Sequence, residues 1–109
     1  MSKDLSILPI PIKKESFEAI LAGTKKEEYR PFSKFWISRL ATTNDAGEIE
    51  GFRKYDIVRF RTGHNSNSAM MDVECKEIVI EEYTEEPEDS EDRYGFAIVL
   101  GNVLATENV

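Results

Sequence analysis

Alternating apolar and polar positions predict β-strands in five parts of this chain. The strands are expected at residues 5–12, 25–30, 55–62, 70–83 and 94–100. Successive side chains of a strand point to opposite faces of a sheet, so a period of two residues indicates a strand with one buried face. The pattern is clearest in the last segment, where every second residue from Tyr94 to Leu100 is apolar.

Two of these strands carry a break in the pattern. Pro9 and Pro11 lie in the first strand. Because proline has no backbone N–H for the hydrogen-bond ladder, this strand is expected at an edge of the sheet or to be irregular. In the fourth strand, Ile78 and Ile80 fall on the opposite parity from Val73. This change of register predicts a β-bulge or a barrel corner between them.

Apolar residues at helical spacing predict two short helices. The first covers residues 13–22 and carries Phe17, Ile20 and Leu21, and the second covers residues 33–41 and carries Trp36, Ile37 and Leu40. Ser33 is placed to cap the second helix. The polar, turn-forming residues 42–54 predict an exposed loop and candidate lid, with a hairpin tip at residues 44–47. Five strands and two short helices indicate an α+β fold with a small, strongly bent sheet or barrel.

Length and composition indicate one soluble globular domain. The chain has 109 residues, of which 40% are hydrophobic and 32% are charged, and this suits a single modest core. Residues 5–104 are expected to form that core and residues 105–109 a flexible tail. No apolar run approaches the roughly 20 residues that span a bilayer, and the first residues lack the features of a secretion signal. A cytoplasmic protein with no membrane partner is therefore expected.

Charge is divided unevenly along the chain. Residues 1–63 hold 12 Lys and Arg against 9 Asp and Glu, whereas residues 64–109 hold 2 against 12, within a net charge of −7. Much of the acid lies in residues 84–93, where like charges repel, so an acidic solvated loop is expected. A basic patch in the first half can therefore coexist with an acidic flank that repels non-specific polyanions.

A cluster of charges follows the first predicted helix. It reads Gly23-Thr24-Lys25-Lys26-Glu27-Glu28-Tyr29-Arg30. The glycine can end the helix in a left-handed conformation. In the extended chain that follows, Lys26, Glu28 and Arg30 share one face of the strand, and Lys25, Glu27 and Tyr29 share the other. The spacing Gly-x-Lys-x-x-Glu-x-Arg resembles the GxKxxExR signature of ASCH domains, which are small β-barrels related to the PUA RNA-binding fold.

This resemblance implies a PUA-like β-barrel over roughly residues 5–104. It also implies a cleft between the sheet and the helices, lined by Lys25, Glu28 and Arg30. In such a cleft Arg30 offers a planar fork for a phosphate or a base edge, Lys25 a point charge and Glu28 a carboxylate acceptor. Without the resemblance, the same residues fit an exposed strand that carries weak ion pairs.

Further candidate binding residues follow from the chemistry of single-stranded RNA recognition. Arg59 and Arg61 share a face of the third predicted strand, and Tyr29, Tyr55 and Trp36 offer aromatic surfaces for base stacking. The alternative is that Trp36 lies in the core and the two arginines are solvated. His64 lies in a turn that can border the cleft. The sequence as a whole predicts a protein that binds RNA or a nucleoside or nucleotide ligand.

The ASCH resemblance also implies an enzymatic alternative, a small hydrolase acting on a modified nucleoside. In the ASCH-type amidohydrolases of acetylated cytidine, the motif lysine works with a threonine three residues later and with a downstream glutamate on a helical segment. Lys25 matches that lysine, but Glu28 stands in place of the threonine, and Thr24 precedes the lysine. Lys25 and Glu28 remain candidates for acid–base catalysis, with Glu74 or Glu77 as a second acid. A ribonuclease on the same cleft would depend on Lys and Glu alone.

A third alternative is a protein-interaction module whose partner binds the acidic loop. The acidic run lacks the glycine and the spaced ligands of an EF-hand calcium loop. Cys75 is the single cysteine, so neither an intrachain disulfide nor a cysteine-based zinc site can form. The sequence therefore predicts no metal site and no cofactor.

Overall fold

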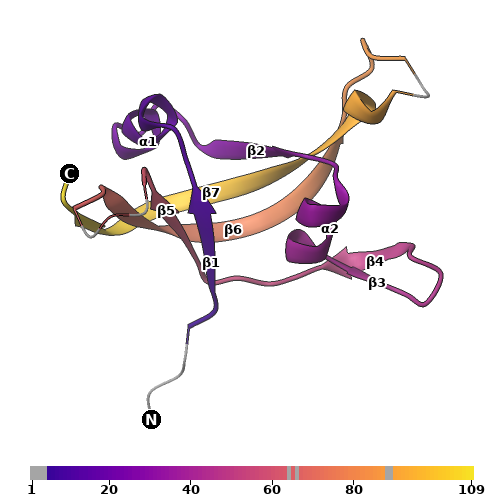
Figure 1. The fold of residues 1–109 in the computed structure, drawn as a ribbon, viewed down its shortest axis with the longest axis horizontal. Helices are drawn as coiled ribbons and strands as arrows, with labels where there is room; N and C mark the ends of the chain where they lie inside the picture. Colours follow the sequence, from indigo (N-terminus) through magenta and orange to yellow (C-terminus); the bar gives the residue numbers. More distant parts are fainter. Residues whose placement is uncertain (1–4, 64, 66, 88–89) are drawn as a thin grey trace. The chain divides into compact units, whose positions relative to one another are not determined.

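The computed structural model describes residues 5–63, 65, 67–87 and 90–109. These residues form an α+β fold with two α-helices and a five-stranded sheet, as the sequence predicted, together with a separate two-stranded sheet (Figure 1). Hydrogen bonds join the strands of the larger sheet in the order β1-β5-β6-β7-β2, and the smaller sheet pairs β3 with β4. Within the described ranges, neither helix has the length and apolar character needed to cross a membrane.

The chain divides into two compact units. Unit 1 takes the described residues of Met1–Lys26, Tyr55–Lys76 and Leu100–Val109, and unit 2 takes those of Glu27–Lys54 and Glu77–Val99. Strands β6 and β7 are long enough to contribute residues to both units.

Unit 1 is built on three neighbouring strands. These are β1 (Ile7–Pro11), β5 (Ile57–Arg61) and the first part of β6 (Met70–Glu82). Strand β1 runs parallel to β5, and β5 runs antiparallel to β6 (Figure 1). One face of these strands is buried, with exposures of 2% or less at Leu8, Ile10, Val58, Phe60, Met71 and Val73. Strand β1 lies at the edge of the sheet, which confirms the prediction made from its prolines.

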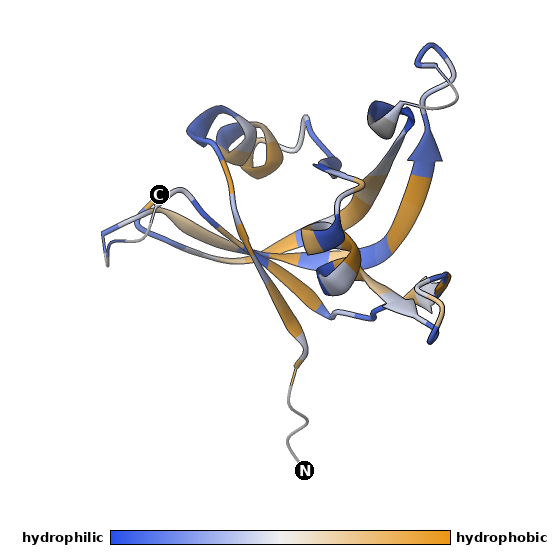
Figure 2. Cartoon of the chain, turned by 45° about the vertical axis from the view of Figure 1, so that its right-hand side comes forward, coloured by the Kyte–Doolittle hydropathy of each residue, from blue (hydrophilic) through white to orange (hydrophobic). Residues whose placement is uncertain are grey.

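Helix α1 (Lys14–Leu21) completes the buried interior of unit 1. Phe17 and Ile20 are buried, as their helical spacing predicted, but Leu21 at the last position of the helix is 39% exposed. Figure 2 shows hydrophobic residues along one side of α1 and hydrophilic residues along the other. After the helix, Gly23 has a φ of 83°. This left-handed conformation confirms the predicted glycine stop.

Strand β7 (Tyr94–Glu107) corrects the prediction for the end of the chain. Its last three residues, 105–107, were expected to belong to a flexible tail. They continue the extended strand instead, and the Asn108 side chain beyond them donates a hydrogen bond from Nδ2 to the carbonyl oxygen of Ser68 at 3.3 Å. This bond ties the end of the strand to the turn that precedes β6.

Unit 2 contains the second half of the charged motif. Its elements are β2 (Glu27–Pro31), α2 (Lys34–Leu40), β3 (Ala41–Thr43), β4 (Ile49–Phe52), the short 3-10 helix η1 (Glu91–Arg93), the end of β6 and the start of β7. Strand β2 pairs antiparallel with β7, with Glu28 opposite Ile98 and Arg30 opposite Phe96. The buried residues of this unit include Leu40, Ala41, Ile78, Phe96, Ala97 and Ile98.

The segment after β2 shows how local signals position α2. Ser33 Oγ accepts a hydrogen bond from the backbone N–H of Trp36 at 3.3 Å, which confirms the predicted N-cap. The helix runs directly into β3 and lies beside the β3–β4 hairpin (Figure 1). Residues 42–54 are therefore not the continuous exposed loop that their polar composition predicted.

The hairpin tip itself was predicted correctly. Asn44 Oδ1 accepts hydrogen bonds from the backbone N–H groups of Ala46 and Glu48, at 2.9 and 3.0 Å, and Gly47 has a φ of 82°. Such Asx-type turns stabilise tight connections. The wider loop prediction was wrong because the polar flanks pair with each other through the strand backbone, which composition alone does not reveal.

Candidate functional site

The predicted ligand-binding residues are divided between the two units. Lys25, Arg59 and Arg61 belong to unit 1, and Glu28, Tyr29 and Arg30 belong to unit 2. The division passes through the charged motif, between Lys26 and Glu27. The motif therefore contributes to both units.

In unit 1, Arg59 and Arg61 lie on the face of the sheet opposite the buried one. The strand register places Pro9 of β1, Arg59 of β5 and Asp72 of β6 in line across three strands. Two residues further along, Pro11 pairs with Arg61. Arg59 and Arg61 therefore share one face of β5, as alternation predicted, and the strand register places both beside prolines of β1.

Arg59 is held by a two-point contact with Asp72. The Arg59 Nε lies 2.8 Å from Asp72 Oδ1, and the terminal NH2 nitrogen lies 3.0 Å from Oδ2. Asp72 is only 8% exposed, and its hydrogen bond to Arg59 raises the pKa of the guanidinium. Bidentate pairs of this kind fix the plane of the arginine fork. Asp72 therefore fixes the orientation of the Arg59 guanidinium and offsets its charge.

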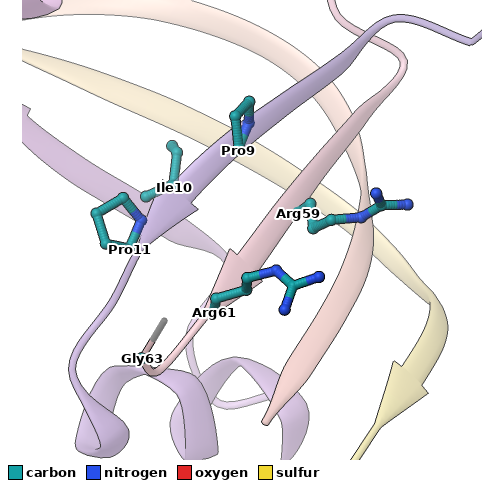
Figure 3. Close-up of a pocket in the computed structure, with 6 residues that line it drawn as sticks. All are labelled: Pro9, Ile10, Pro11, Arg59, Arg61 and Gly63. Carbon is teal, nitrogen blue, oxygen red and sulfur yellow. The ribbon is translucent and has the colours of Figure 1, made fainter. Parts of the chain in front are cut away.

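The two arginines line a cavity of about 160 Å³, which we name the arginine cavity. Its other lining residues are Pro9, Ile10, Pro11 and Gly63. Figure 3 shows both guanidinium groups extending from β5 toward the same side. Arg61 is exposed, and Arg59 is partly exposed. A small cavity with apolar walls and two guanidinium groups suits a compact anion such as a phosphate.

A second cavity of unit 1, also about 160 Å³, lies where α1 ends; we name it the lysine cavity. The motif residues Gly23, Lys25 and Lys26 line it together with residues 100–103 of β7. Lys25 Nζ donates a hydrogen bond to Ser16 Oγ at 3.3 Å. Two ammonium groups at one small cavity again favour an anionic group.

Glu74, one of the candidate second acids, lies next to the β7 segment that lines the lysine cavity. Its Oε1 accepts a hydrogen bond from the backbone N–H of Asn102 at 3.4 Å. A Cβ at Gly101 would clash with the Glu74 carboxylate, so the glycine leaves room for this acid. The other candidate, Glu77, is an exposed residue of unit 2.

A larger cavity beside α1 was not anticipated from the sequence. It measures about 380 Å³ and is lined in part by Lys14, Phe17, Leu21 and Thr62. Leu21 is exposed because it borders this cavity rather than packing in the interior. Leu21 was assigned to the core from its helical spacing, which is why the cavity was not anticipated.

In unit 2, Glu28 and Arg30 lie on the same side of β2, as alternation predicted. Glu28 is only 5% exposed, and its Oε1 accepts a hydrogen bond from the backbone N–H of Tyr29 at 3.0 Å. The Arg30 NH1 nitrogen lies 3.2 Å from Glu28 Oε1 and donates to the carbonyl oxygen of Tyr29 at 2.7 Å. The carboxylate and the backbone therefore orient Arg30.

Tyr29 and Glu27 occupy the other side of β2. The Tyr29 hydroxyl donates a hydrogen bond to Glu27 Oε1 at 2.9 Å. This bond, with smaller contributions from partial burial and from nearby acids, raises the pKa of Tyr29 to about 12. The ring is 46% exposed, so its face is accessible to a ligand of unit 2.

Trp36 on α2 provides the aromatic partner of Arg30. The Arg30 guanidinium carbon lies 5.3 Å from the centre of the Trp36 ring, within the range of a cation–π contact. The sequence left open whether Trp36 is a stacking surface or a core residue. In the structure Trp36 is half-buried, which is intermediate between the two. Tyr55, the remaining aromatic candidate, is half-buried in unit 1.

Phe35 is the functional candidate that the sequence analysis missed. It is 54% exposed, and the Arg39 guanidinium carbon lies 4.7 Å from the centre of its ring. The signal available in the sequence was an aromatic pair, Phe35-Trp36, inside a short segment with Lys34 and Arg39 and no acid. The helical spacing directed attention to Trp36 instead.

Cys75 and the acidic residues give little support to a further catalytic or metal site among the described residues. Burial raises the pKa of the Cys75 thiol, which disfavours the reactive thiolate. Among the described residues no three His, Cys, Asp or Glu side chains gather closely enough to hold a metal ion. His64 and residues 88–89 of the predicted acidic loop lie outside the described residues.

No family model, curated protein or solved structure matches the chain. Its function is therefore inferred from the side chains described above and from the resemblance of its charged motif.

Proposed function

We propose that this protein binds RNA or a nucleotide ligand through the phosphate groups. The observation that carries the proposal is the arginine cavity, in which Asp72 fixes Arg59 while Arg61 stands exposed on the same strand face. Arginine is suited to phosphate because its planar fork matches two phosphate oxygens. The proline rings on β1 give the cavity a rigid apolar wall.

The charged motif supports the same chemistry from each unit separately. In unit 1, Lys25 and Lys26 line the lysine cavity. In unit 2, Glu28 orients Arg30. An ASCH-like identity with a PUA-like barrel is part of this proposal, and it rests on the spacing of Gly23, Lys25, Glu28 and Arg30 in the sequence.

The test is the binding of a short fluorescein-labelled single-stranded RNA, followed by anisotropy over a series of salt concentrations. The change Arg61→Ala should lower affinity about fivefold, equivalent to roughly 1 kcal/mol. It should also reduce the slope of log affinity against log salt by about 1, because one phosphate contact is lost. The matched control is Lys76→Ala, since Lys76 is an exposed cation of unit 1 outside both named cavities.

The change Arg61→Lys distinguishes the contribution of the two-point guanidinium contact from that of the positive charge. A lysine keeps the positive charge but loses the two-point contact, so its affinity should fall between those of the wild type and Arg61→Ala. Equal affinity for the wild type, Arg61→Ala and Lys76→Ala would remove the arginine cavity as the site. Absence of binding to RNA, mononucleotides and inorganic phosphate would contradict the proposed function.

A second candidate function, hydrolysis of an acylated nucleoside, is favoured by one specific contact. The sequence offered no nucleophile beside Lys25, but the structure places the Ser16 hydroxyl 3.3 Å from Lys25 Nζ. Thr24, by contrast, donates its hydroxyl to the carbonyl oxygen of Ala19 at 3.1 Å. Ser16 is therefore the hydroxyl to test for attack on an acyl group.

The hydrolase candidate is tested by incubating the protein with N-acylated cytidines and following release of the free nucleoside. Turnover should disappear in both Ser16→Ala and Lys25→Ala if these residues act together. Thr24→Ala serves as the matched hydroxyl control and should retain activity. No turnover by the wild type above the Lys25→Ala variant would remove this candidate and leave the binding proposal intact.

A further inference from the structure

Helix α2 of unit 2 presents an exposed aromatic ring to solvent. Phe35 is 54% exposed, and it meets Trp36 edge to face, with ring centres 5.1 Å apart and ring planes at 89°. An exposed phenylalanine contributes nothing to a core, and its adjacent tryptophan is only half-buried. The two rings together form a small aromatic surface on a short, well-capped helix.

Each of the two rings has an arginine over it. The guanidinium carbon of Arg39 lies 4.7 Å from the centre of the Phe35 ring, and that of Arg30 lies 5.3 Å from the centre of the Trp36 ring. We name these four residues the aromatic–arginine platform. Guanidinium planes and aromatic rings are the two side-chain surfaces on which nucleic-acid bases stack.

The charge of α2 favours a polyanionic ligand, while Glu28 offsets the charge of Arg30. The sequence of α2, from Lys34 to Leu40, contains two cations and no acid. Another cation, Arg53, reaches the same helix and donates from Nε to the carbonyl oxygen of Ser38 at 3.1 Å. Exposed aromatic groups among cations match a ligand that combines flat apolar bases with negative phosphates.

We propose that the aromatic–arginine platform binds unpaired bases of a single-stranded RNA. The inference rests on the proposed function, since the arginine cavity of unit 1 would supply phosphate contacts to any RNA. The platform adds selectivity for the single strand. Bases of a duplex are already stacked and paired, so only an unpaired base can lay its face on Phe35 or slide against Trp36.

The single tryptophan of the chain makes the platform directly observable. Trp36 is the only tryptophan, so intrinsic tryptophan fluorescence reports on α2 and on no other helix. We would titrate the protein with oligouridine, with a duplex of matched length and with inorganic polyphosphate, which has phosphates but no bases. Oligouridine should quench or shift the fluorescence, and polyphosphate should bind without doing so.

The variant that tests the inference is Phe35→Leu, which keeps an apolar side chain and removes the stacking face. Its affinity for oligouridine should fall at least about fivefold, because one aromatic stacking face is lost. Its affinity for polyphosphate should not change. The matched control is Phe52→Leu, because Phe52 of β4 is also an exposed phenylalanine of unit 2 at 37%.

Other outcomes would overturn the inference in distinguishable ways. If labelled RNA binds but Trp36 fluorescence is unchanged and Phe35→Leu binds as well as the wild type, the platform is not the contact, and the proposed function stands. If no RNA binds but mononucleotides or inorganic phosphate do, the inference alone is overturned; if none of these ligands binds, the proposed function is overturned as well. If Trp36 fluorescence instead depends on protein concentration and Phe35→Leu abolishes this dependence, α2 is a self-association surface rather than a base-binding one.

Discussion

The molecule orients an arginine with a carboxylate in two different ways. In unit 1, Asp72 lies across the strands from Arg59 and grips it at two points, 2.8 and 3.0 Å. In unit 2, Glu28 lies on the same strand as Arg30, contacts it at 3.2 Å, and Trp36 lies against the guanidinium. The first arrangement fixes the plane of the Arg59 guanidinium beside a cavity with proline walls. The second places the face of the Arg30 guanidinium against an aromatic ring.

The difference shows that one residue type is prepared for two kinds of contact, one in each unit. A fork held in plane suits the oxygens of a phosphate. A guanidinium stacked on an aromatic ring extends a flat surface that suits a base. Removing one partner at a time tests what each arrangement contributes.

The largest expected effect is on stability, from Asp72→Ala in unit 1. This change removes both acceptors of Arg59 at a carboxylate that is 8% exposed. The free energy of unfolding should fall by about 2 kcal/mol, because hydrogen bonds to charged groups are worth roughly 1.5 to 3 kcal/mol. Urea denaturation measures the free energy of unfolding of each variant. Asp45→Ala, in the exposed hairpin tip, should change stability by less than about 0.5 kcal/mol; equal values for the two variants would show that the Asp72 contact adds nothing.

A smaller effect is expected on RNA affinity, from changes at Arg30 in unit 2. Arg30→Ala should weaken binding of single-stranded RNA about fivefold, since it removes one surface on which a base can stack and such stacking is worth at least about 1 kcal/mol. Arg30→Lys should lose nearly as much, because an ammonium has no flat face. At Arg61, by contrast, the lysine variant should keep part of the affinity. Anisotropy titrations of the two lysine variants compare them; if Arg30→Lys binds like the wild type, Arg30 acts through its charge alone.

The smallest effect concerns the opposite side of β2. The Glu27 carboxylate favours the neutral phenol of Tyr29, so its pKa rises from 10.0 to about 12. The stabilisation from this pair is complete below pH 10 and is lost as the pH rises through about 12, because the unfolded phenol ionises first. In an alkaline titration followed by phenolate absorbance, the difference between the wild type and Tyr29→Phe gives the titration of Tyr29 alone. Glu27→Gln should move the midpoint of the titration back toward 10.0. An unchanged midpoint would mean that Glu27 does not raise the pKa of Tyr29.

Much of the fold followed from local signals in the sequence. The cap at Ser33, the stop at Gly23 and the edge position of β1 all depend on one or two residues and their immediate backbone. The two strands that flank the hairpin tip did not follow, because their pairing with each other depends on backbone contacts that composition does not reveal. The extension of β7 was missed for a similar reason, since its end is held by Asn108, a contact distant in sequence.

The candidate sites divide in the same way. Alternation alone placed Glu28 with Arg30 and Arg59 with Arg61. It could not show that Asp72 faces Arg59, because that depends on the register between β5 and β6. Nor could it show that Phe35 is exposed, since helical spacing does not reveal which side of a short helix is left uncovered.

The prolines of β1 have a consequence beyond the wall of the arginine cavity. The backbone N–H of Ile12 bonds to the carbonyl oxygen of Arg61, so N–H groups of this parity face β5, and those at positions 9 and 11 would face outward. Position 7 shares this outward parity, but positions 9 and 11 are proline, so only Ile7 keeps an outward N–H within β1. The β1 edge of the sheet therefore has a single outward N–H where another extended chain would need several, and it resists the strand addition by which exposed edges nucleate aggregates.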